Sequence, residues 1–234
     1  MLLLPAFLSP LLNTLNTGFF MTRAKPGAEP HGVDERHDEG LPERGFHERM
    51  QALSVPRQQA FMAALTERML PNYGLYSDTT GHGDPAGIRA ILDLVWEQLL
   101  VKGAKIDFER QVEKLAELEP PAEDDSFGAR RATDAVVAIS AILDTLRGDA
   151  PEAVLEVSRV SRAAVRAFIE LTEGEEDGAV LAKMVKQHPL MEDENDFQDA
   201  VLEGAEGDFE RDDIKALRRL GRNGGVSNLG LTLD

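Results

Sequence analysis

Apolar residues recur every three or four positions through most of the chain after residue 45. This spacing places them on one face of an α-helix, which has 3.6 residues per turn. No run alternates apolar and polar residues as a half-buried strand would. The pattern predicts an all-α bundle of about seven to nine mostly antiparallel helices. Four stripes make up the expected core: Phe61, Leu65 and Met69; Ile88, Ile91, Leu92, Val95 and Leu99; Val136, Ile139, Leu143 and Leu146; and Val154, Val157, Val160, Val165, Phe168 and Leu171.

Proline, glycine and short polar residues indicate where these helices begin and end. Pro56 and Pro85 are typical of a first helical turn, since proline fits there and a preceding Ser or Asp caps free backbone amides. Gly103, Gly148 and Gly174 are typical of helix ends. The remaining helices are expected to begin at Asp107, Asp125–Ser126, Asp149–Pro151, Asp177, Leu190 and Glu210.

The composition fits one ordinary folded domain. The chain has 234 residues, 42% of them hydrophobic, which suffices for a real core. Its 42 acidic against 25 basic residues give a net charge of −17, which disfavours binding to nucleic acid or to an anionic membrane. The absence of cysteine from the sequence excludes disulfides, thiol catalysis and iron–sulfur clusters.

The first 45 residues are expected to form an extension outside the fold. Residues 1–20 are apolar but broken by prolines, and no basic residue precedes them as in a signal peptide. We interpret Met21 as an alternative start, with residues 1–20 untranslated; a weak membrane-surface anchor is the other interpretation. Residues 22–45 are rich in Pro, Gly and charge, which predicts disorder. A single helical domain is predicted over 46–234, in the cytoplasm.

Negative charge is concentrated between residues 170 and 213. This segment holds sixteen acidic and three basic residues, a balance of −13. One interpretation is a solvated surface that maintains solubility. Another is a binding surface for a basic protein, and a third is mimicry of a nucleic-acid backbone. Within the fold, the expected counter-charges lie on the next helix: Lys215, Arg218, Arg219 and Arg222.

Polar and aromatic residues are dense between residues 71 and 97. Loops on rigid scaffolds are common places for binding sites, so we expect a ligand pocket at the 71–89 turn and the helix after it. Arg89 lies one turn into that helix, whose N-terminus attracts anions such as phosphate or carboxylate. A tight turn between helices explains the local glycines equally well. The candidate pocket residues are Asn72, Tyr73, His82, Asp84, Arg89, Trp96 and Glu97.

The motifs of metal and nucleophilic chemistry are missing. His82 and His188 are the only histidines well inside the expected fold, and neither follows a Glu by three positions as a di-iron bundle requires. Residues 193–198 faintly resemble a calcium loop but lack its glycine. No Ser has His and acidic partners at motif spacing. We therefore predict no catalytic residue, no metal ligand and no cofactor.

Four fragments, taken together and in order, resemble the YjaG family, a bacterial family of unknown function. The resemblance covers residues 46 to 233 and implies an all-helical cytosolic domain. It implies no reaction, cofactor or functional residue. The fragments are Glu67-Arg68-Met69 with Pro71-Asn72-Tyr73, then Gly81 to Asp84, then Ile91 to Glu97, and finally Ser227 to Gly230.

Two functions of different classes remain open from the sequence. The first is a non-enzymatic protein that binds a macromolecule, either a basic protein through residues 170–213 or a second copy of itself. The alternative is a small-molecule-binding protein or enzyme with a polar pocket between residues 71 and 97. Convergence of the polar side chains on one cavity would favour the second.

Overall fold

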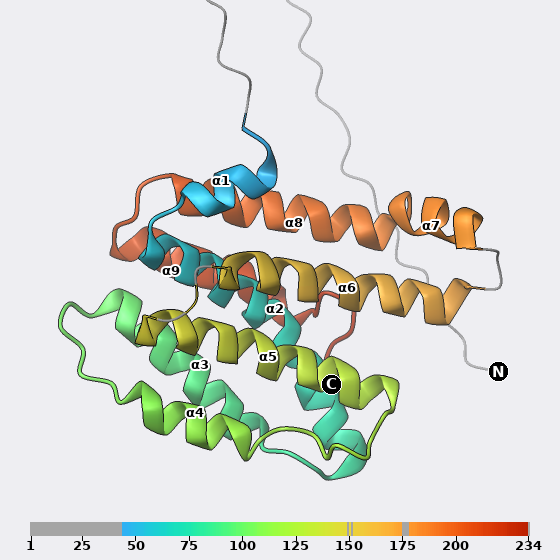
Figure 1. The fold of residues 1–234 in the computed structure, drawn as a ribbon, viewed down its shortest axis with the longest axis horizontal. Coiled ribbons are helices and arrows are strands. Elements are labelled where there is room, and N and C mark those ends of the chain that lie inside the picture. Colours follow the sequence, from blue (N-terminus) through green and yellow to red (C-terminus); the bar gives the residue numbers. More distant parts are fainter. Residues whose placement is uncertain (1–43, 149, 151, 175–177, 234) are drawn as a thin grey trace, which may run out of the picture. The chain divides into compact units, whose positions relative to one another are not determined.

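The computed structural model describes residues 44–148, 150, 152–174 and 178–233. Within these ranges the chain forms nine α-helices, one short 3-10 turn and no strand, which confirms the predicted all-α fold (Figure 1). The predicted extension over 1–45 lies outside the described residues except at its end. The helices are α1 Phe46–Ala52, α2 Val55–Thr80, α3 Pro85–Leu100, α4 Phe108–Ala116, α5 Phe127–Arg147, α6 Ala153–Glu173, α7 Gly178–Lys186, α8 Pro189–Glu206 and α9 Arg211–Arg222.

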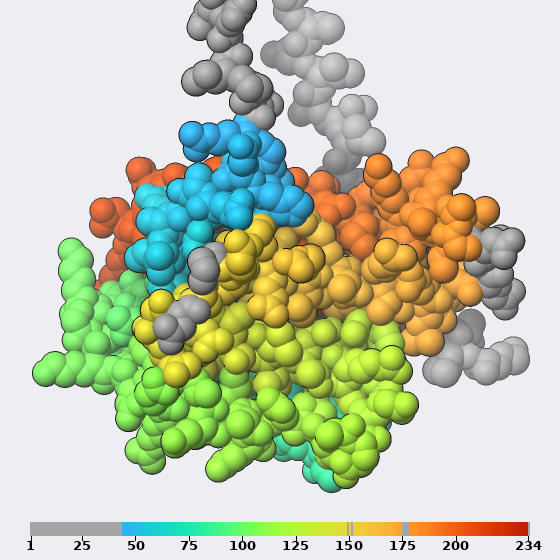
Figure 2. Space-filling model, in the orientation of Figure 1, coloured from blue at the N-terminus to red at the C-terminus, as the bar shows by residue number. Residues whose placement is uncertain are grey.

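Helix α2 is the centre of the bundle. It contacts α3, α5, α6, α8 and α9, and its predicted stripe of Phe61, Leu65 and Met69 is fully buried. In the space-filling view of Figure 2, α5 and α6 extend across the middle of the visible face and cover most of α2. Because α2 is packed on all sides, polar residues along it are forced into the interior.

Helix α2 continues through Pro71, where the sequence suggested a turn. The helix ends only at Thr80, so the loop before α3 is limited to residues 81–84. Proline normally disrupts a helix, because it lacks a backbone N–H and its ring crowds the preceding turn. Here the residues before and after Pro71 are buried, and the packing of α2 as a whole against five other helices outweighs the local cost. The expected 71–89 turn is therefore corrected to a helix followed by a four-residue loop.

Several predicted capping residues occupy the expected helix ends, whereas Ser54 makes no side-chain capping hydrogen bond and α3 ends at Leu100, before the predicted stop at Gly103. Asp84 accepts a hydrogen bond from the amide of Gly87 at 2.9 Å, which caps α3. Ser126 accepts one from the amide of Ala129 at 3.2 Å and caps α5, which ends at Gly148. The start signals at residues 149, 151 and 177 lie outside the described residues.

The four apolar stripes form the core, with one exception. Val157 and Val165 of α6 are fully buried, as predicted, whereas Leu171 is 62% exposed. Leu171 lies roughly 200° around the helix from the buried Ile169, because two residues advance a helix by that angle. The predicted buried stripe of α6 therefore ends before Leu171. No described helix is long and apolar enough to cross a membrane.

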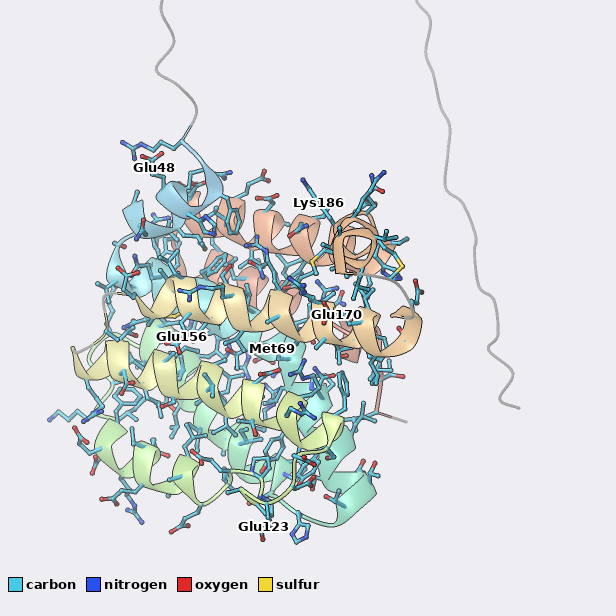
Figure 3. All side chains as sticks on the ribbon, turned by 45° about the vertical axis from the view of Figure 1, so that its right-hand side comes forward. Glu48, Met69, Glu123, Glu156, Glu170 and Lys186 are labelled. Carbon is cyan, nitrogen blue, oxygen red and sulfur yellow. The ribbon has the colours of Figure 1, made fainter. Side chains whose placement is uncertain are left out.

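Helix α9 packs against α2 at unusually short range. A Cβ atom on Gly221 would lie only 2.5 Å from the carbonyl oxygen of Ala64, so this position requires glycine. The close approach carries the basic side chains of α9 to the polar residues of α2. In Figure 3, Met69 of α2 lies inside the bundle, whereas Glu48 and Glu123 extend from its outside.

Candidate functional site

A buried carboxylate on α2 organises the candidate site. Glu67 is almost completely buried, and both of its oxygens have partners. The indole Nε1 of Trp96 donates a hydrogen bond to Glu67 Oε1 at 2.9 Å, and Arg89 Nη1 donates to Oε2 at 2.7 Å. Both partners come from α3, so the carboxylate joins α2 to α3. A buried charge is tolerated when it is paired and hydrogen-bonded in this way.

Helix α9 adds two more guanidinium groups. Arg218 Nε lies 3.3 Å from Glu67 Oε1, and Arg222 Nε lies 3.7 Å from Oε2. Asp93 pairs with Arg218 and lies 3.8 Å from Arg89. Three cations therefore surround two carboxylates. The cluster is net positive although the whole chain carries a charge of −17.

A cavity of about 530 Å³ opens beside this cluster. It lies between α2, α3, the end of α9 and the C-terminal segment. Charged groups occupy part of its wall and apolar side chains the rest, so it offers an amphipathic surface. The lining residues are Glu67, Leu70, Pro71, Tyr73, Gly74, Pro85, Ala86, Ile88, Arg89, Arg222, Gly225 and Leu233.

The N-terminus of α3 forms part of the same wall. Pro85 and Ala86, the first two residues of this 16-residue helix, line the cavity. The aligned peptide dipoles of a helix place a partial positive charge at its N-terminus. The carboxylate of Asp84 already caps this N-terminus, so the positive charge that the wall offers to an anion comes from the guanidinium groups of Arg89 and Arg222.

The structure brings four of the predicted pocket residues to this region. Arg89 and Tyr73 line the cavity, and Trp96 supports it through Glu67. Asp84 caps α3, and its backbone amide donates to the Tyr73 hydroxyl at 3.2 Å. Tyr73 in turn donates to the carbonyl of Leu118 at 2.8 Å, and burial raises the pKa of its phenol.

The other three predicted residues lie elsewhere. The side chain of Asn72 is rotated by about 100° around α2 from that of Tyr73. Its Nδ2 donates a hydrogen bond at 2.9 Å to Oδ1 of Asn228 in the C-terminal segment. His82 and Glu97 are exposed to solvent. Consecutive residues of a helix point about 100° apart, and this rotation places Asn72 toward the C-terminal segment while Tyr73 lines the cavity.

Sequence reasoning missed Glu67, Arg218 and Arg222 as site residues. Glu67 lies next to Arg68 in one of the fragments that resemble the YjaG family, but nothing in the sequence distinguishes it from a surface acid. Arg218 and Arg222 are four residues apart, which places them on one face of α9. That spacing was the available signal, although it could not identify α2 as the partner.

The basic residues of α9 that were expected to neutralise the acidic segment form ion pairs with different partners. Lys215 does pair with an acid of that segment, Asp212, at 2.7 Å. Arg218 and Arg222 instead contact Glu67, and for these two the prediction is wrong. The close packing of α9 on α2 turns their side chains toward the buried carboxylate and away from α8.

The acids of α8 that form ion pairs use basic residues from earlier helices. Arg68 of α2 pairs with Asp193 and lies 3.4 Å from Glu194. Arg49 of α1 pairs with Glu206 at 2.6 Å. Burial raises the pKa of Glu194, against the opposing effect of its hydrogen bonds and of the nearby Arg68.

The described part of the chain contains no group of three or more His, Asp or Glu side chains arranged to hold one metal ion. The cavity is lined by guanidinium, carboxylate, phenol and apolar groups.

Comparisons with known proteins place the fold among uncharacterised bacterial proteins. Residues 45–232 match the family model described as "Protein of unknown function (DUF416)". The "Uncharacterized protein YjaG" of Escherichia coli strain K12 is 39% identical over 192 residues, which cover 80% of this chain and 95% of that protein. An "Uncharacterized protein" of Haemophilus influenzae is 35% identical, covering 80% and 96% respectively. The predicted resemblance to the YjaG family is thus confirmed.

A solved structure agrees with this relationship. The crystal structure of a DUF416 family protein from Shewanella baltica OS155 is 34% identical to this chain and aligns with a TM-score of 0.75. The alignment covers 82% of this chain and all of the other. The helical fold is therefore shared by proteins of this group.

Proposed function

The chain belongs to the DUF416 family of proteins of unknown function, and we propose that it binds a small anionic molecule in the cavity between α2, α3 and α9. One observation supports this proposal above the others. The guanidinium groups of Arg89 and Arg222 line one cavity, and among the described residues lining it only Glu67 is acidic. The three guanidinium groups of the cluster outnumber its two carboxylates by one, so positive charge remains available.

The two arginines differ in how much each offers to a ligand. Arg89 has 32% of its side chain exposed and is held to Glu67 at 2.7 Å. Arg222 is 53% exposed, and its single carboxylate contact is a loose 3.7 Å. We therefore assign recognition of the anion mainly to Arg222, with Arg89 assisting. A guanidinium binds carboxylate or phosphate through two parallel N–H groups.

The rest of the cavity sets the shape of the ligand. Pro71, Ala86 and Leu233 present apolar surface next to the charged wall. A molecule that satisfies both parts carries one carboxylate or phosphate on an apolar body. A highly charged or sugar-like molecule would leave the apolar wall without a partner. The expected ligand class is thus a small amphipathic anion.

Benzoate and benzamide give a matched test of this assignment. The two molecules share an aromatic ring but differ in the charge of the group it carries. Isothermal titration should show benzoate binding to the full-length protein more tightly than benzamide. Arg222→Gln should weaken benzoate binding by about ten- to a hundredfold, since a hydrogen bond to a charged group contributes about 1.5–3 kcal/mol. Arg219→Gln, which removes the same charge from the same helix outside the cavity, should leave binding unchanged.

Two results would overturn the proposal. Equal affinity for benzoate and benzamide would show that the cavity does not select an anion. Equal weakening by Arg219→Gln and Arg222→Gln would show that only the overall charge of the chain matters. Titrations at two salt concentrations separate this general effect from a local one, because exposed charges are screened beyond about 8 Å at physiological ionic strength.

The outer face of α8 supports a second candidate function, the binding of a basic protein. Four acids spaced by four, three and four residues lie on this face, and all are exposed: Glu192, Asp196, Asp199 and Glu203. At this spacing they form one stripe of negative charge. A basic protein should co-purify with the chain at low salt and be lost at 1 M salt. Retention by a variant with the four acids changed to amides would contradict this assignment.

Self-association is the remaining form of the interaction hypothesis. Native mass spectrometry at low and high salt distinguishes it directly. A dimer that disappears in the variant with four amides on α8 would indicate a second copy as the partner. A monomer at every concentration would reject this form.

A further inference from the structure

A groove of about 430 Å³ lies between α6, α7 and the start of α8. It shares no lining residue with the first cavity at Arg222 or with a cavity of about 330 Å³ beside Asn72. Four of its lining side chains are apolar, four are cationic and one is an amide. The lining residues are Arg159, Arg162, Ala163, Arg166, Ala182, Val185, Lys186, Met191 and Asn195.

The groove concentrates positive charge on a chain that is acidic as a whole. Among the described residues that line it, none is acidic. It lies beside residues 170–213, which carry a balance of −13. Arg159 and Lys186 are exposed, and neither forms an ion pair with another described residue. Their charges are therefore available to a ligand.

Arg162 is held in a fixed orientation in the wall of the groove. Its guanidinium group lies 4.6 Å above the ring of Phe46. Its Nε donates to Oδ1 of Asn195 at 3.0 Å, and its Nη1 donates to the hydroxyl of Ser158 at 3.3 Å. These contacts fix the side chain before a ligand arrives, which lowers the entropic cost of binding.

The carboxylates around the groove compensate its charge only in part. Burial lowers the pKa of Arg162, and the opposing effect of Glu194 and Asp199 does not cancel this. Neither of these two carboxylates forms a direct ion pair with Arg162. Arg166 does pair with Glu170, at 2.7 Å. Among the described residues, one carboxylate therefore pairs directly with the four cations of the groove.

The polar side chains of the groove offer hydrogen-bond donors to a ligand. Guanidinium and ammonium groups have no acceptor. The only side-chain oxygen among the lining residues, Oδ1 of Asn195, already accepts from Nε of Arg162. A ligand that satisfies the groove must therefore supply acceptors and negative charge. Phosphate supplies both, and a guanidinium group binds it through two parallel N–H groups.

We propose that this groove binds a small phosphate compound that carries at least two phosphate groups. Residues three or four positions apart on a helix have Cβ atoms about 5–6 Å apart, so neighbouring arginines of α6 can bind neighbouring phosphates. Lys186 adds a fourth positive charge from α7. A single carboxylate would use only part of this set. The site is thus separate from the anion binding proposed at Arg222.

Inorganic pyrophosphate, titrated into the full-length protein, tests the groove. It should bind at least about tenfold more tightly than orthophosphate, because its second phosphate adds hydrogen bonds to charged groups. Arg159→Gln combined with Lys186→Gln should weaken pyrophosphate binding by about tenfold or more. The matched control combines Arg130→Gln with Lys105→Gln, which removes the same charge at exposed positions outside the groove. This control should leave the affinity unchanged.

Glu170→Gln tests the groove by a gain of binding. The substitution releases Arg166 from its ion pair and removes a negative charge beside the groove. Pyrophosphate should therefore bind about three- to tenfold more tightly. Glu123→Gln makes the same change of charge at an exposed position on another side of the bundle (Figure 3) and should have no such effect.

Four results would overturn the proposal. The first is the absence of measurable pyrophosphate binding, and the second is equal affinity for pyrophosphate and orthophosphate. The third is equal weakening by the two double variants, which would show a response to overall charge alone. The fourth is loss of pyrophosphate binding in Arg222→Gln, which would place the ligand in the first cavity. Benzoate binding should persist in the variant at residues 159 and 186, so the two sites can fail independently.

Discussion

Trp96 donates its indole N–H to Glu67 Oε1 at 2.9 Å, and both side chains are buried in the interior of the bundle. This contact joins the central helix α2 to α3 and holds the carboxylate around which Arg89, Arg218 and Arg222 gather. The lone tryptophan is therefore a positioning residue for the charged wall of the first cavity. Its role combines stability with site geometry, and the two can be measured separately.

Trp96→Phe should destabilise the fold and disturb the anion site together. The substitution removes the N–H group that donates to the buried Glu67 carboxylate. Loss of a hydrogen bond to a buried acceptor lowers the free energy of unfolding by about 1–3 kcal/mol. Urea unfolding should show this decrease in the free energy of unfolding. Glu97→Gln, at the exposed neighbouring position, should change stability by less than about 0.5 kcal/mol. Equal stability of the two variants would reject the role assigned to the Trp96 contact.

Gly221→Ala should separate α9 from α2. Its Cβ would lie 2.5 Å from a backbone oxygen of Ala64, and backbone cannot move aside as a flexible side chain can. Overpacking of this kind costs about 1–3 kcal/mol or more. Thermal unfolding should show a lower Tm, and benzoate affinity should fall because Arg222 shifts with α9. Gly207→Ala, where the nearest atom lies 3.6 Å from the added Cβ, should leave both values unchanged.

Asn228→Ala should release the C-terminal segment. The backbone amide of Asn228 donates to the carbonyl of Arg68 at 3.1 Å, while its side chain links Asn72 to Ser161. Loss of the side chain leaves buried polar groups unpaired, at a cost of about 1–3 kcal/mol. Limited proteolysis should cut the segment after α9 faster than in the natural chain. Thr232→Ala, at an exposed position of the same segment, is the control. Equal cutting rates of the Asn228→Ala and Thr232→Ala variants would contradict the anchoring role of Asn228.

Asp134 should make stability depend on pH. Burial raises its pKa from 3.8 to about 6, despite the opposing effect of Arg131. The folded chain therefore keeps this proton to a higher pH than the unfolded chain does. Stability is lost as the pH rises from about 4 to about 6, by up to about 3 kcal/mol, and stays lower above that range.

Urea unfolding at pH 4 and pH 7 checks this direction. Relative to Asp134→Asn, which has no such proton, the natural chain should lose free energy of unfolding between the two values. Asp144→Asn changes a more exposed position on the same helix. Its free energy of unfolding should change between pH 4 and pH 7 by the same amount as that of the natural chain. A natural chain that gains stability relative to Asp134→Asn over this range would show that the Arg131 pair dominates.

Most of the fold could be predicted from the sequence because its signals are local. Asp84 and Ser126 cap helices wherever the neighbouring backbone is helical, and Gly148 ends one for an equally local reason. Pro71 misled the prediction because its local preference opposes the helix, whereas distant packing decides the outcome. Local sequence preferences predict the conformation of such a residue poorly when tertiary packing favours the opposite conformation.

The candidate site could be predicted only in part. Arg89 and Tyr73 were found because the short loop and the start of α3 cluster polar residues in the sequence. Glu67 and Arg222 are 155 positions apart, and their meeting depends on the close packing of α9 on α2. No local pattern records that contact. Asn72 was recognised as a candidate but belongs to a different cavity, since helical geometry separates it from Tyr73.

Binding of an anion by Arg89 and Arg222 in the first cavity can be observed at the two side chains themselves. Proton–nitrogen correlation spectra of the arginine Nε groups, recorded during a titration with benzoate, report on each guanidinium separately. The Arg89 and Arg222 signals should shift and saturate, the Arg219 signal should stay in place, and benzamide should cause no such response. Small, non-saturating shifts shared by all exposed arginines would contradict binding at these two residues, because they would report general screening by an added salt and no bound ligand.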